Sequence, residues 1–415
     1  NNKEKKPALS GVERIVPQLR FPEFKSDGEW KVKMLGDKDV SKIVMGSSPK
    51  SANYNTDGKG LPLIQGNADI KKRLSVPRIF TSEITKECLV DDILLSVRAP
   101  VGTVAKSLHK ACIGRGISAI RTVKDNSQEY LYQWLISFEP YWQDISQGGA
   151  FDAVNSDDIK KVSIPFPSPN EQEKIANCLS SLDDVINAEA EKLELLQDHK
   201  KGLLQHLFPQ EGETQPKYRF PEFEDEGDWK ETTLDAVADY ENGKAHEKEI
   251  SKTGKYKVVN SKFISTEGEV VKFSDSVNLE TKIGDILMVL SDIPNGKALS
   301  KCFYVDKNDT YTVNQRICKI TSTNINSVFL FYQLNRNKYF LRFDDGNKQT
   351  NLRKDDVLNC PILKPINPKE QDKIANTLIS ASKLIEEQQE KIRRLQAHKK
   401  GLLQQLFPNL NDVAV

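Results

Sequence analysis

Short groups of amide, hydroxyl and guanidinium side chains are the residues of this sequence best suited to chemistry. In the first half they are Gln65, Asn67, Ser96 and Arg98, which follow apolar runs typical of strands. Amides and arginines at strand ends can form paired hydrogen bonds with the edges of adenine or guanine. The same residue types also build ordinary turns, which leaves turn formation as the alternative.

The second half carries comparable groups, and the first half adds a basic stretch. The polar candidates of the second half are Asn260, Lys262, Asn314, Gln315, Arg316, Lys348, Gln349 and Asn351. The basic stretch consists of Lys71, Lys72, Arg73 and Arg78. Cationic side chains of this kind contact phosphates in nucleic-acid complexes, although a solvated loop would look the same.

Catalytic and metal-binding patterns are absent from the sequence. It contains no Asn/Asp-Pro-Pro-Tyr/Phe motif for amino-group methylation, no strand–G-x-G–helix, and no G-x-x-x-x-G-K-[ST] phosphate loop. Its six cysteines form no C-x-x-C pair and are not grouped with the five histidines at ligand spacing. We therefore predict no catalytic residues, no metal site and buried, unreactive thiols.

Composition limits the class of protein. The chain has 415 residues, 60 Lys and Arg against 59 Asp and Glu, and a net charge of +1, which excludes a strongly basic, tail-like nucleic-acid binder. Mean hydropathy is -0.54, and no apolar run is long enough to span a membrane. The first residues lack the apolar segment of a secretory signal. We expect a cytoplasmic protein of two or three domains.

An internal repeat of 199 residues organises the chain. Arg-Phe-Pro-Glu-Phe occurs at 20–24 and again at 219–223, and Trp30 recurs as Trp229. Segments 171–209 and 370–408 are identical at 23 of 39 positions. The residues between these ends have diverged, so the two copies share their termini and differ in their middles. Because both copies keep the aromatic residues of the first motif, we expect those residues to pack rather than to stack on bases.

The repeated ends 171–207 and 370–406 have the pattern of long helices. A Ser-Pro-x-Glu or Asn-Pro-x-Glu sequence precedes each one, which predicts a capping box with proline in the first turn. Apolar residues recur in both at the alternating spacing of a coiled-coil seam. The seam residues are Ile175, Leu179, Leu182, Ile186, Leu193, Leu196 and Leu203 in the first helix, and Ile374, Leu378, Ile385, Ile392, Leu395 and Leu402 in the second.

Charge favours pairing of these helices with each other. Residues 171–207 carry eight acids and four bases, whereas 370–406 carry five acids and seven bases. A 37-residue helix is roughly 55 Å long, so the first helix leads away from the first globular domain and the second returns antiparallel. The predicted fold is therefore α+β: two globular mixed α/β domains joined by two long antiparallel coiled-coil helices, in a pseudo-two-fold tandem repeat.

Taken together, the doubled motifs R-F-P-E-F, E-Q-x-K-I-A-N and H-K-K-G-L-L-Q-x-L-F-P resemble the specificity subunit of type I restriction–modification enzymes. The resemblance covers about residues 20–409. It implies two target recognition domains that read the halves of a bipartite, asymmetric site in double-stranded DNA. It also implies that the helices set the spacer and bind two methyltransferase subunits, which use S-adenosylmethionine, and that restriction subunits join for cleavage. The chain itself would bind no cofactor.

The resemblance and the repeat together predict the domain boundaries. They are a tail at 1–19, recognition domains at 20–168 and 219–367, spacer helices at 169–209 and 368–409, a linker at 210–218 and a tail at 410–415. The alternative from another functional class is a non-enzymatic coiled-coil adaptor whose two heads bind proteins.

Overall fold

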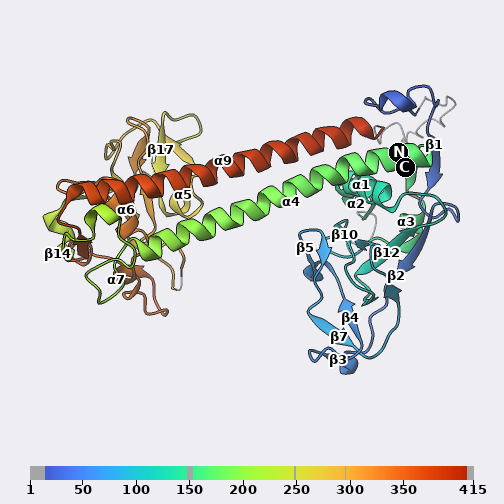
Figure 1. Ribbon diagram of the computed structural model, residues 1–415, viewed down its shortest axis with the longest axis horizontal. Helices are drawn as coiled ribbons and strands as arrows, with labels where there is room; N and C mark the ends of the chain where they lie inside the picture. The colour runs from blue at the N-terminus through green and yellow to red at the C-terminus, as the bar shows by residue number, and fades with distance from the viewer. Residues whose placement is uncertain (1–14, 147–152, 247–248, 295, 409–415) are drawn as a thin grey trace, which may run out of the picture. The chain divides into compact units, whose positions relative to one another are not determined.

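The computed structural model describes residues 15–146, 153–246, 249–294 and 296–408. The chain divides into two compact units, residues 1–191 with 390–415, and residues 192–389. Two long helices, α4 (Pro169–His206) and α9 (Pro368–Leu406), are each shared between the units (Figure 1). The predicted boundaries separate these helices from the globular domains, whereas each unit contains a part of each helix.

The globular part of the first unit contains two larger sheets and a two-stranded ribbon among its described residues. One sheet has the order β2 (Ser41–Met45), β12 (Ile117–Thr122), β9 (Ile93–Ser96), β10 (Val104–Lys106), β6 (Leu74–Ser75) and β5 (Ile70–Lys71). The other has the order β3 (Tyr54–Asn55), β7 (Ile79–Thr81), β4 (Leu61–Ile64), β11 (Ala111–Ile113) and β8 (Glu87–Cys88). The ribbon pairs β1 (Lys31–Met34) with β13 (Ser163–Phe166), antiparallel. Three short helices complete this part: α1 (Gln128–Phe138), α2 (Trp142–Ser146) and α3 (Ser156–Lys160).

Strand β9 lies at the centre of this unit and is buried on both faces. Ile93 and Leu95 belong to the apolar cluster that includes Trp134 of α1, whereas Leu94 belongs to a second cluster with Ile64 and Ile113 of the other sheet. A strand buried on both sides is continuously apolar, which explains the unbroken Ile-Leu-Leu run. The central strand therefore holds the helix layer and both sheets together.

The second unit repeats this plan with fewer strands. One sheet has the order β15 (Ala238–Asn242), β23 (Ile317–Ser322), β19 (Ile286–Val289) and β21 (Cys302–Tyr304). The other has the order β16 (Ile250–Ser251), β18 (Lys272–Ser274), β17 (Tyr256–Val259) and β22 (Tyr311–Val313). Two ribbons pair β14 (Lys230–Thr233) with β25 (Pro361–Lys364), and β20 (Ser291–Asp292) with β24 (Thr350–Asn351). The short helices are α5 (Ser261–Ser265), α6 (Ser327–Leu334), α7 (Lys338–Leu341) and α8 (Lys354–Leu358).

The long helices run antiparallel, as the sequence predicts. In the first unit, Ile175 and Leu179 at the start of α4 share a buried cluster with Leu406 and Phe407 at the end of α9. In the second unit the roles are reversed, because the cluster there joins the end of α4 to the start of α9. Each globular domain is therefore completed by the helix end of the other repeat. Its own helix starts beside it and ends in the other unit.

The predicted seam positions are all buried or half-buried. Several apolar side chains of the same helices that lie off the seam are exposed instead, as Leu195 shows at 70% and Leu384 at 52%. This difference in exposure follows the heptad spacing rather than residue type. It is the result expected when one stripe of each helix packs against a partner.

The motif Arg-Phe-Pro-Glu-Phe anchors the start of each long helix through a buried ion pair. Arg20 donates from Nε and Nη2 to the two carboxylate oxygens of Glu171, at 2.7 and 2.8 Å. Arg219 does the same to Glu370, at 2.9 and 2.8 Å. The hydrogen bond to Glu171 raises the pKa of Arg20, and that to Glu370 raises the pKa of Arg219. The Ser168 hydroxyl accepts from the Glu171 backbone at 3.4 Å, as a capping box requires, but the glutamate half of both predicted boxes is wrong, because both carboxylates accept hydrogen bonds from arginine.

The glutamine that follows each of these glutamates connects the long helix to a short one. Gln172 accepts a hydrogen bond from the backbone of Ser127, the residue before α1, at 3.0 Å. Gln371 accepts the equivalent bond from Asn326, before α6, also at 3.0 Å. Trp30 and Trp229 are 4% and 2% exposed, which supports their predicted role in packing. The repeated motifs are therefore structural.

One group of side-chain contacts between the long helices and a short helix differs between the two units. In the first unit, Lys399 of α9 donates to Asp183 of α4 at 2.6 Å, and Gln133 of α1 donates to the same carboxylate at 2.9 Å. The positions 199 residues away are Lys200, Ser382 and Tyr332. There the Tyr332 hydroxyl bonds Ser382 at 3.0 Å and Lys200 lies 5.4 Å from the Tyr332 ring centre. The lysine is the same in both units, whereas Asp183 and Gln133, which bond each other, are both replaced in the second.

Removing one member of the anchoring ion pair will destabilise the chain strongly. We predict that Glu171→Ala, and separately Glu370→Ala, lowers the free energy of unfolding by about 3–5 kcal/mol, because each leaves a buried arginine without its carboxylate. Glu173→Ala, at an exposed position of the same helix, should change it by less than about 0.5 kcal/mol. Urea unfolding followed by tryptophan fluorescence measures both, and equal effects would contradict the anchoring role.

Candidate nucleic-acid interface

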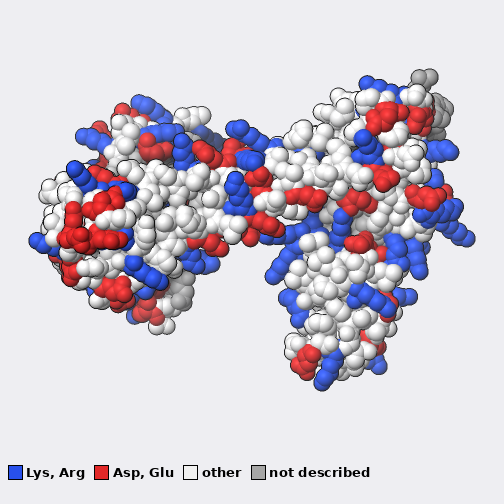
Figure 2. Space-filling view, viewed as in Figure 1, with Lys and Arg blue, Asp and Glu red and all other residues white. Residues whose placement is uncertain are grey.

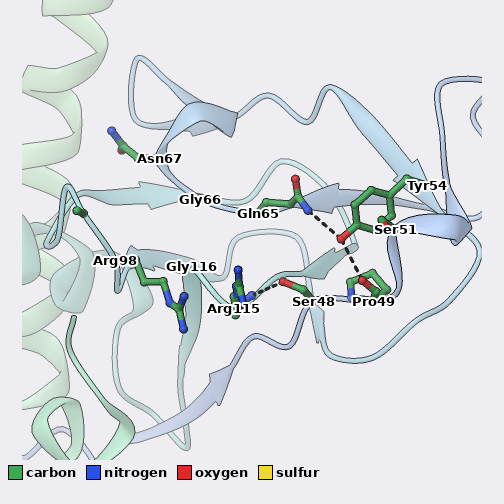
Figure 3. A pocket seen from close by; sticks show the side chains of 11 residues that line it. Ser48, Pro49, Ser51, Tyr54, Gln65, Gly66, Asn67, Arg98, Arg115 and Gly116 are labelled. Carbon is green, nitrogen blue, oxygen red and sulfur yellow. Dashed lines mark hydrogen bonds between the residues drawn. The ribbon is translucent and has the colours of Figure 1, made fainter. Parts of the chain in front are cut away.

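Three turns of the first unit meet at the ends of neighbouring strands and line an open pocket of about 590 Å³ (Figure 3). The turns follow β4, β9 and β11 and contribute Gln65 with Asn67, Arg98, and Arg115 respectively. Three of the residues predicted from the sequence are thus brought together, although they are up to 33 positions apart in the chain. Arg115 joins them from the Gly-Arg-Gly turn, which the sequence analysis did not single out as a candidate.

Backbone hydrogen bonds fix these turns against one another. The amide of Gly114 donates to Ile64 at 2.8 Å, and that of Val97 donates to Gly116 at 2.9 Å. Gly46 approaches from β2, and a Cβ atom built there would lie 2.1 Å from the carbonyl oxygen of Gly114. The pocket is therefore formed by backbone that is held on several sides.

A chain of hydrogen bonds orients the amide at the edge of the pocket. Gln65 donates from Nε2 to the Tyr54 hydroxyl at 3.0 Å, and that hydroxyl donates to the carbonyl of Pro49 at 3.0 Å (Figure 3). Ser48 accepts a hydrogen bond from the backbone of Arg115 at 3.2 Å. The glutamine side chain is thus positioned before any ligand binds, which reduces the entropy that binding must overcome.

Both arginines of the pocket are available for a ligand. Arg98 and Arg115 are exposed, and neither forms an ion pair within the part of the chain that the structure describes. Each guanidinium presents several donors in a fixed planar arrangement, which suits two adjacent acceptors on a base or a phosphate.

The second unit places its candidate residues on the same framework. Asn314 donates from its backbone to Val259 at 3.0 Å, and Leu290 donates to Arg316 at 2.9 Å, so the turns after β17, β19 and β22 meet as those of the first unit do. A Cβ at Gly243 would lie 2.1 Å from the Asn314 carbonyl. The backbone bonds make Asn260 equivalent to Gln65 despite their different neighbours in sequence.

A fourth segment approaches the same turns in the second unit. Ser291 and Asn351 are paired across the β20–β24 ribbon, and Gln349 donates from Nε2 to the Ser291 hydroxyl at 2.7 Å. In the first unit, Arg98 and Ala153 form the matching bridge. Ser291 therefore occupies the position of Arg98, and the candidates around 348–351 lie beside it rather than in a separate region. Lys348 and Asn351 are exposed.

Some candidates are committed to local structure. Ser96 is 1% exposed, and its hydroxyl donates to the carbonyls of Arg98 and Pro100, so its side chain does not reach the surface. Asn260 accepts from the backbone of Phe263 at 2.9 Å as the N-cap of α5. Asn314 accepts from the backbone of Gln315 at 2.9 Å. For these residues the alternative of turn formation describes the observed contacts.

The basic stretch of the first unit divides into two kinds of residue. Arg73 binds Glu139 through two hydrogen bonds at 2.6 and 2.9 Å, which raise its pKa, and Arg78 binds Asp69 at 2.9 Å. Lys71 and Lys72 are exposed on the β5–β6 turn. The arginines therefore already hold elements of the domain together, and Lys71 is better placed for a phosphate.

Other residues that contact the turns or line the pocket carry a weak signal in the sequence. Lys262 and Arg316 are exposed near the turns of the second unit. The backbone of Arg316 has a φ of +68°, a conformation that residues other than glycine adopt infrequently. Tyr54 and Ser48 affect the pocket indirectly, because they accept hydrogen bonds from Gln65 and from the backbone of Arg115. They could be found from the sequence only by knowing which loops meet.

Charge on the visible surface is mixed rather than segregated, with Lys and Arg interspersed among Asp and Glu (Figure 2). No group of potential metal ligands occurs within the described residues. The helices described there include none long and apolar enough to cross a membrane. Cys318 and Cys360 are buried, and burial raises the pKa of each thiol to about 12, so neither is present as a reactive thiolate at neutral pH.

Comparison with known proteins gives the family. The model of the type I restriction modification DNA specificity domain matches residues 27–198 and again 226–397. The chain belongs to this family. The two matches are offset by 199 residues, the length of the internal repeat, so each repeat is one copy of the family's domain. Two mixed α/β domains with packed long helices, as predicted, are confirmed by this result and by the observed fold.

Two curated relatives come from Methanocaldococcus jannaschii. The chain is 34% identical over 180 residues to a putative type I restriction enzyme MjaX specificity subunit, covering 43% of this chain and 42% of that protein. It is 31% identical over 191 residues to the MjaIX specificity subunit, covering 43% and 44%. Each match therefore spans less than half of the relative's length. The crystal structure of a type I restriction-modification S subunit from M. genitalium has the same fold, with a TM-score of 0.61 at 17% identity over 95% of this chain and 100% of that one.

The close approach at Gly46 gives a prediction for the pocket. Gly46→Ala should lower the free energy of unfolding by about 1–3 kcal/mol, since the added methyl group meets backbone that cannot move aside. Gly243→Ala should do the same in the second unit. Gly202→Ala is the matched control, because nothing lies within 4 Å of a Cβ there, and it should be neutral or stabilising by up to about 1 kcal/mol. A neutral Gly46→Ala would show that the turns are not held together.

Proposed function

We propose that the chain is the DNA sequence-specificity subunit of a type I restriction–modification complex. Each unit contacts one half of a bipartite, asymmetric site in double-stranded DNA, through the turns around Gln65 and Arg98 in the first and around Asn260 and Arg316 in the second. The observation that carries the proposal is the common backbone framework that presents different side chains at the same strand ends. Two domains that bind different half-sites need the same backbone framework with different side chains at the strand ends.

The remaining candidates have distinct roles in this proposal. Lys71, Lys72, Lys262 and Lys348 contact phosphates and set the orientation, whereas Asn67, Gln315, Gln349 and Asn351 face base edges beside the central turns. The chain supplies no catalytic group. Adenine methylation belongs to two methyltransferase subunits that bind the long helices and use S-adenosylmethionine, and cleavage belongs to restriction subunits. The complex acts in the cytoplasm, where host DNA is accessible.

Reconstitution tests the division of labour. The chain mixed with its methyltransferase subunits, S-adenosylmethionine and genomic DNA should give methylation at one two-part sequence, and the methyltransferase subunits alone should give none at that site. Duplex binding by the complex should weaken steeply as salt rises, because phosphate contacts release counterions. Binding of proteins but not duplex DNA would favour the adaptor alternative.

The paired helices predict how the gap between half-sites can be changed. Lys391 bonds Glu189 at 2.6 Å and Lys399 bonds Asp183 at 2.6 Å, which sets the register of α4 against α9 within the first unit. Seven residues inserted after Glu191 and seven after Gln389 would extend both helices while keeping the seam in phase. The added length of about 10.5 Å should widen the gap by about three base pairs, at 3.4 Å each.

Methylome sequencing of a host that expresses the lengthened subunit measures the gap. A single insertion in α4 is the control, since it leaves the seam of one helix unmatched and should reduce methylation at every site. If the double insertion left the gap unchanged, the helices would not act as the spacer.

A further inference from the structure

The pocket of the first unit carries an inference about which base this unit reads. At the two exposed positions that flank its turns, the first unit has Arg98 and Arg115, whereas the second unit has Ser291 and Gln315 at the equivalent places. The equivalence rests on backbone bonds: Val97 to Gly116 and Leu290 to Arg316, both at 2.9 Å, and the matching bridges of Arg98 to Ala153 and Ser291 to Asn351. One scaffold therefore presents two exposed guanidinium groups in one unit, whereas at the equivalent places of the other it has a buried Ser291, whose hydroxyl accepts a hydrogen bond from Gln349, and an exposed Gln315.

We infer that the first unit recognises guanine in its half-site, through the guanidinium groups of Arg98 and Arg115 in this pocket. The inference rests on the proposed function. Arginine pairs with the O6 and N7 acceptors of guanine in the major groove, and no other base presents two acceptors there. Adenine would place an amino donor against a guanidinium, which has no acceptor.

The surroundings of the two arginines favour a base over a phosphate. A phosphate contact needs only a mobile cation at the rim, such as Lys71. The two arginines instead follow buried strands, since β9 and β11 are buried along their full lengths. The oriented amide of Gln65 lies in the same pocket, where it can bond a neighbouring base edge (Figure 3). A rigid, concave site with planar donors and one fixed amide gives the positional precision that base readout requires.

The test compares methylation by complexes that contain the full chain, Arg98→Ala, Arg115→Ala or Lys110→Ala. Lys110→Ala is the control. It also removes a positive charge, but at the opposite end of β11, where Lys110 contacts Glu87 at 3.2 Å. Methylome sequencing gives the sequence logo for each complex. We expect one half-site of the unaltered complex to contain guanine, and both arginine variants to relax guanine positions in that same half-site. The other half-site should stay unchanged, which also shows that the variants fold.

Duplex binding supplies the second measurement. Replacing the relevant guanine by 7-deazaguanine, which lacks the N7 acceptor, should weaken binding of the unaltered complex about 10-fold and leave the affinity of the matching arginine variant nearly unchanged. Unchanged logos in both arginine variants would overturn the inference while leaving the proposed function intact. Uniform weakening at all sequences with a reduced salt dependence would also overturn it, because that is the signature of a phosphate contact. If the unaltered complex methylated no two-part site, the proposed function would fail and the inference with it.

Discussion

The packing of each long helix end against the globular domain of the other repeat is the constraint on which the rest of this structure depends. A helix of this length with one apolar stripe is not stable alone in water. The stripe on α4 begins in one buried cluster, with Leu406 and Phe407, and ends in another, with Ile374 and Leu378. Each repeat's helix end is buried against the domain of the other repeat, so each domain is completed by the other copy.

The duplication separates residues that hold the fold from residues that vary. Arg20 with Glu171, and Gln172 with the start of α1, recur unchanged because each makes several buried polar contacts at once, and losing one partner leaves the other unsatisfied. At the strand ends the backbone bonds recur, but Arg98 becomes Ser291 and Arg115 becomes Gln315. The two repeats therefore share the backbone framework and differ in the side chains at the strand ends, which is the combination that the proposed function requires.

The sequence predicted the elements well where a local pattern decides them. The long helices follow from their apolar periodicity, their pairing with each other follows from opposite charge, and the antiparallel direction follows from the length of the first helix and the order of the domains along the chain. It did not predict that Glu171 would bind Arg20 rather than cap its own helix, because that choice depends on a residue 151 positions away. The internal copy at Glu370 offered the signal, since both motifs are conserved together.

Predicting the candidate interface was harder, for a physical reason. Gln65, Asn67 and Arg98 were proposed one by one as residues at strand ends, but their proximity depends on strand order, which short β-strands of this kind do not encode locally. Arg115 was not among the candidates, although it also lies just after a buried strand. Ser96 was included because it ends an apolar run, whereas the structure buries its hydroxyl against two carbonyls.

The contact between Asp183 and Lys399 offers the most direct measurement of the central claim, because it joins the start of α4 to the end of α9. Lys399 is 12% exposed and Asp183 32%, so the pair is sheltered from solvent. A double-mutant cycle with Asp183→Ala, Lys399→Ala and both together, followed by urea unfolding, isolates their interaction. The helix arrangement predicts a coupling energy of at least about 0.5 kcal/mol. Strict additivity of the two substitutions would contradict the packing of one repeat's helix end on the domain of the other.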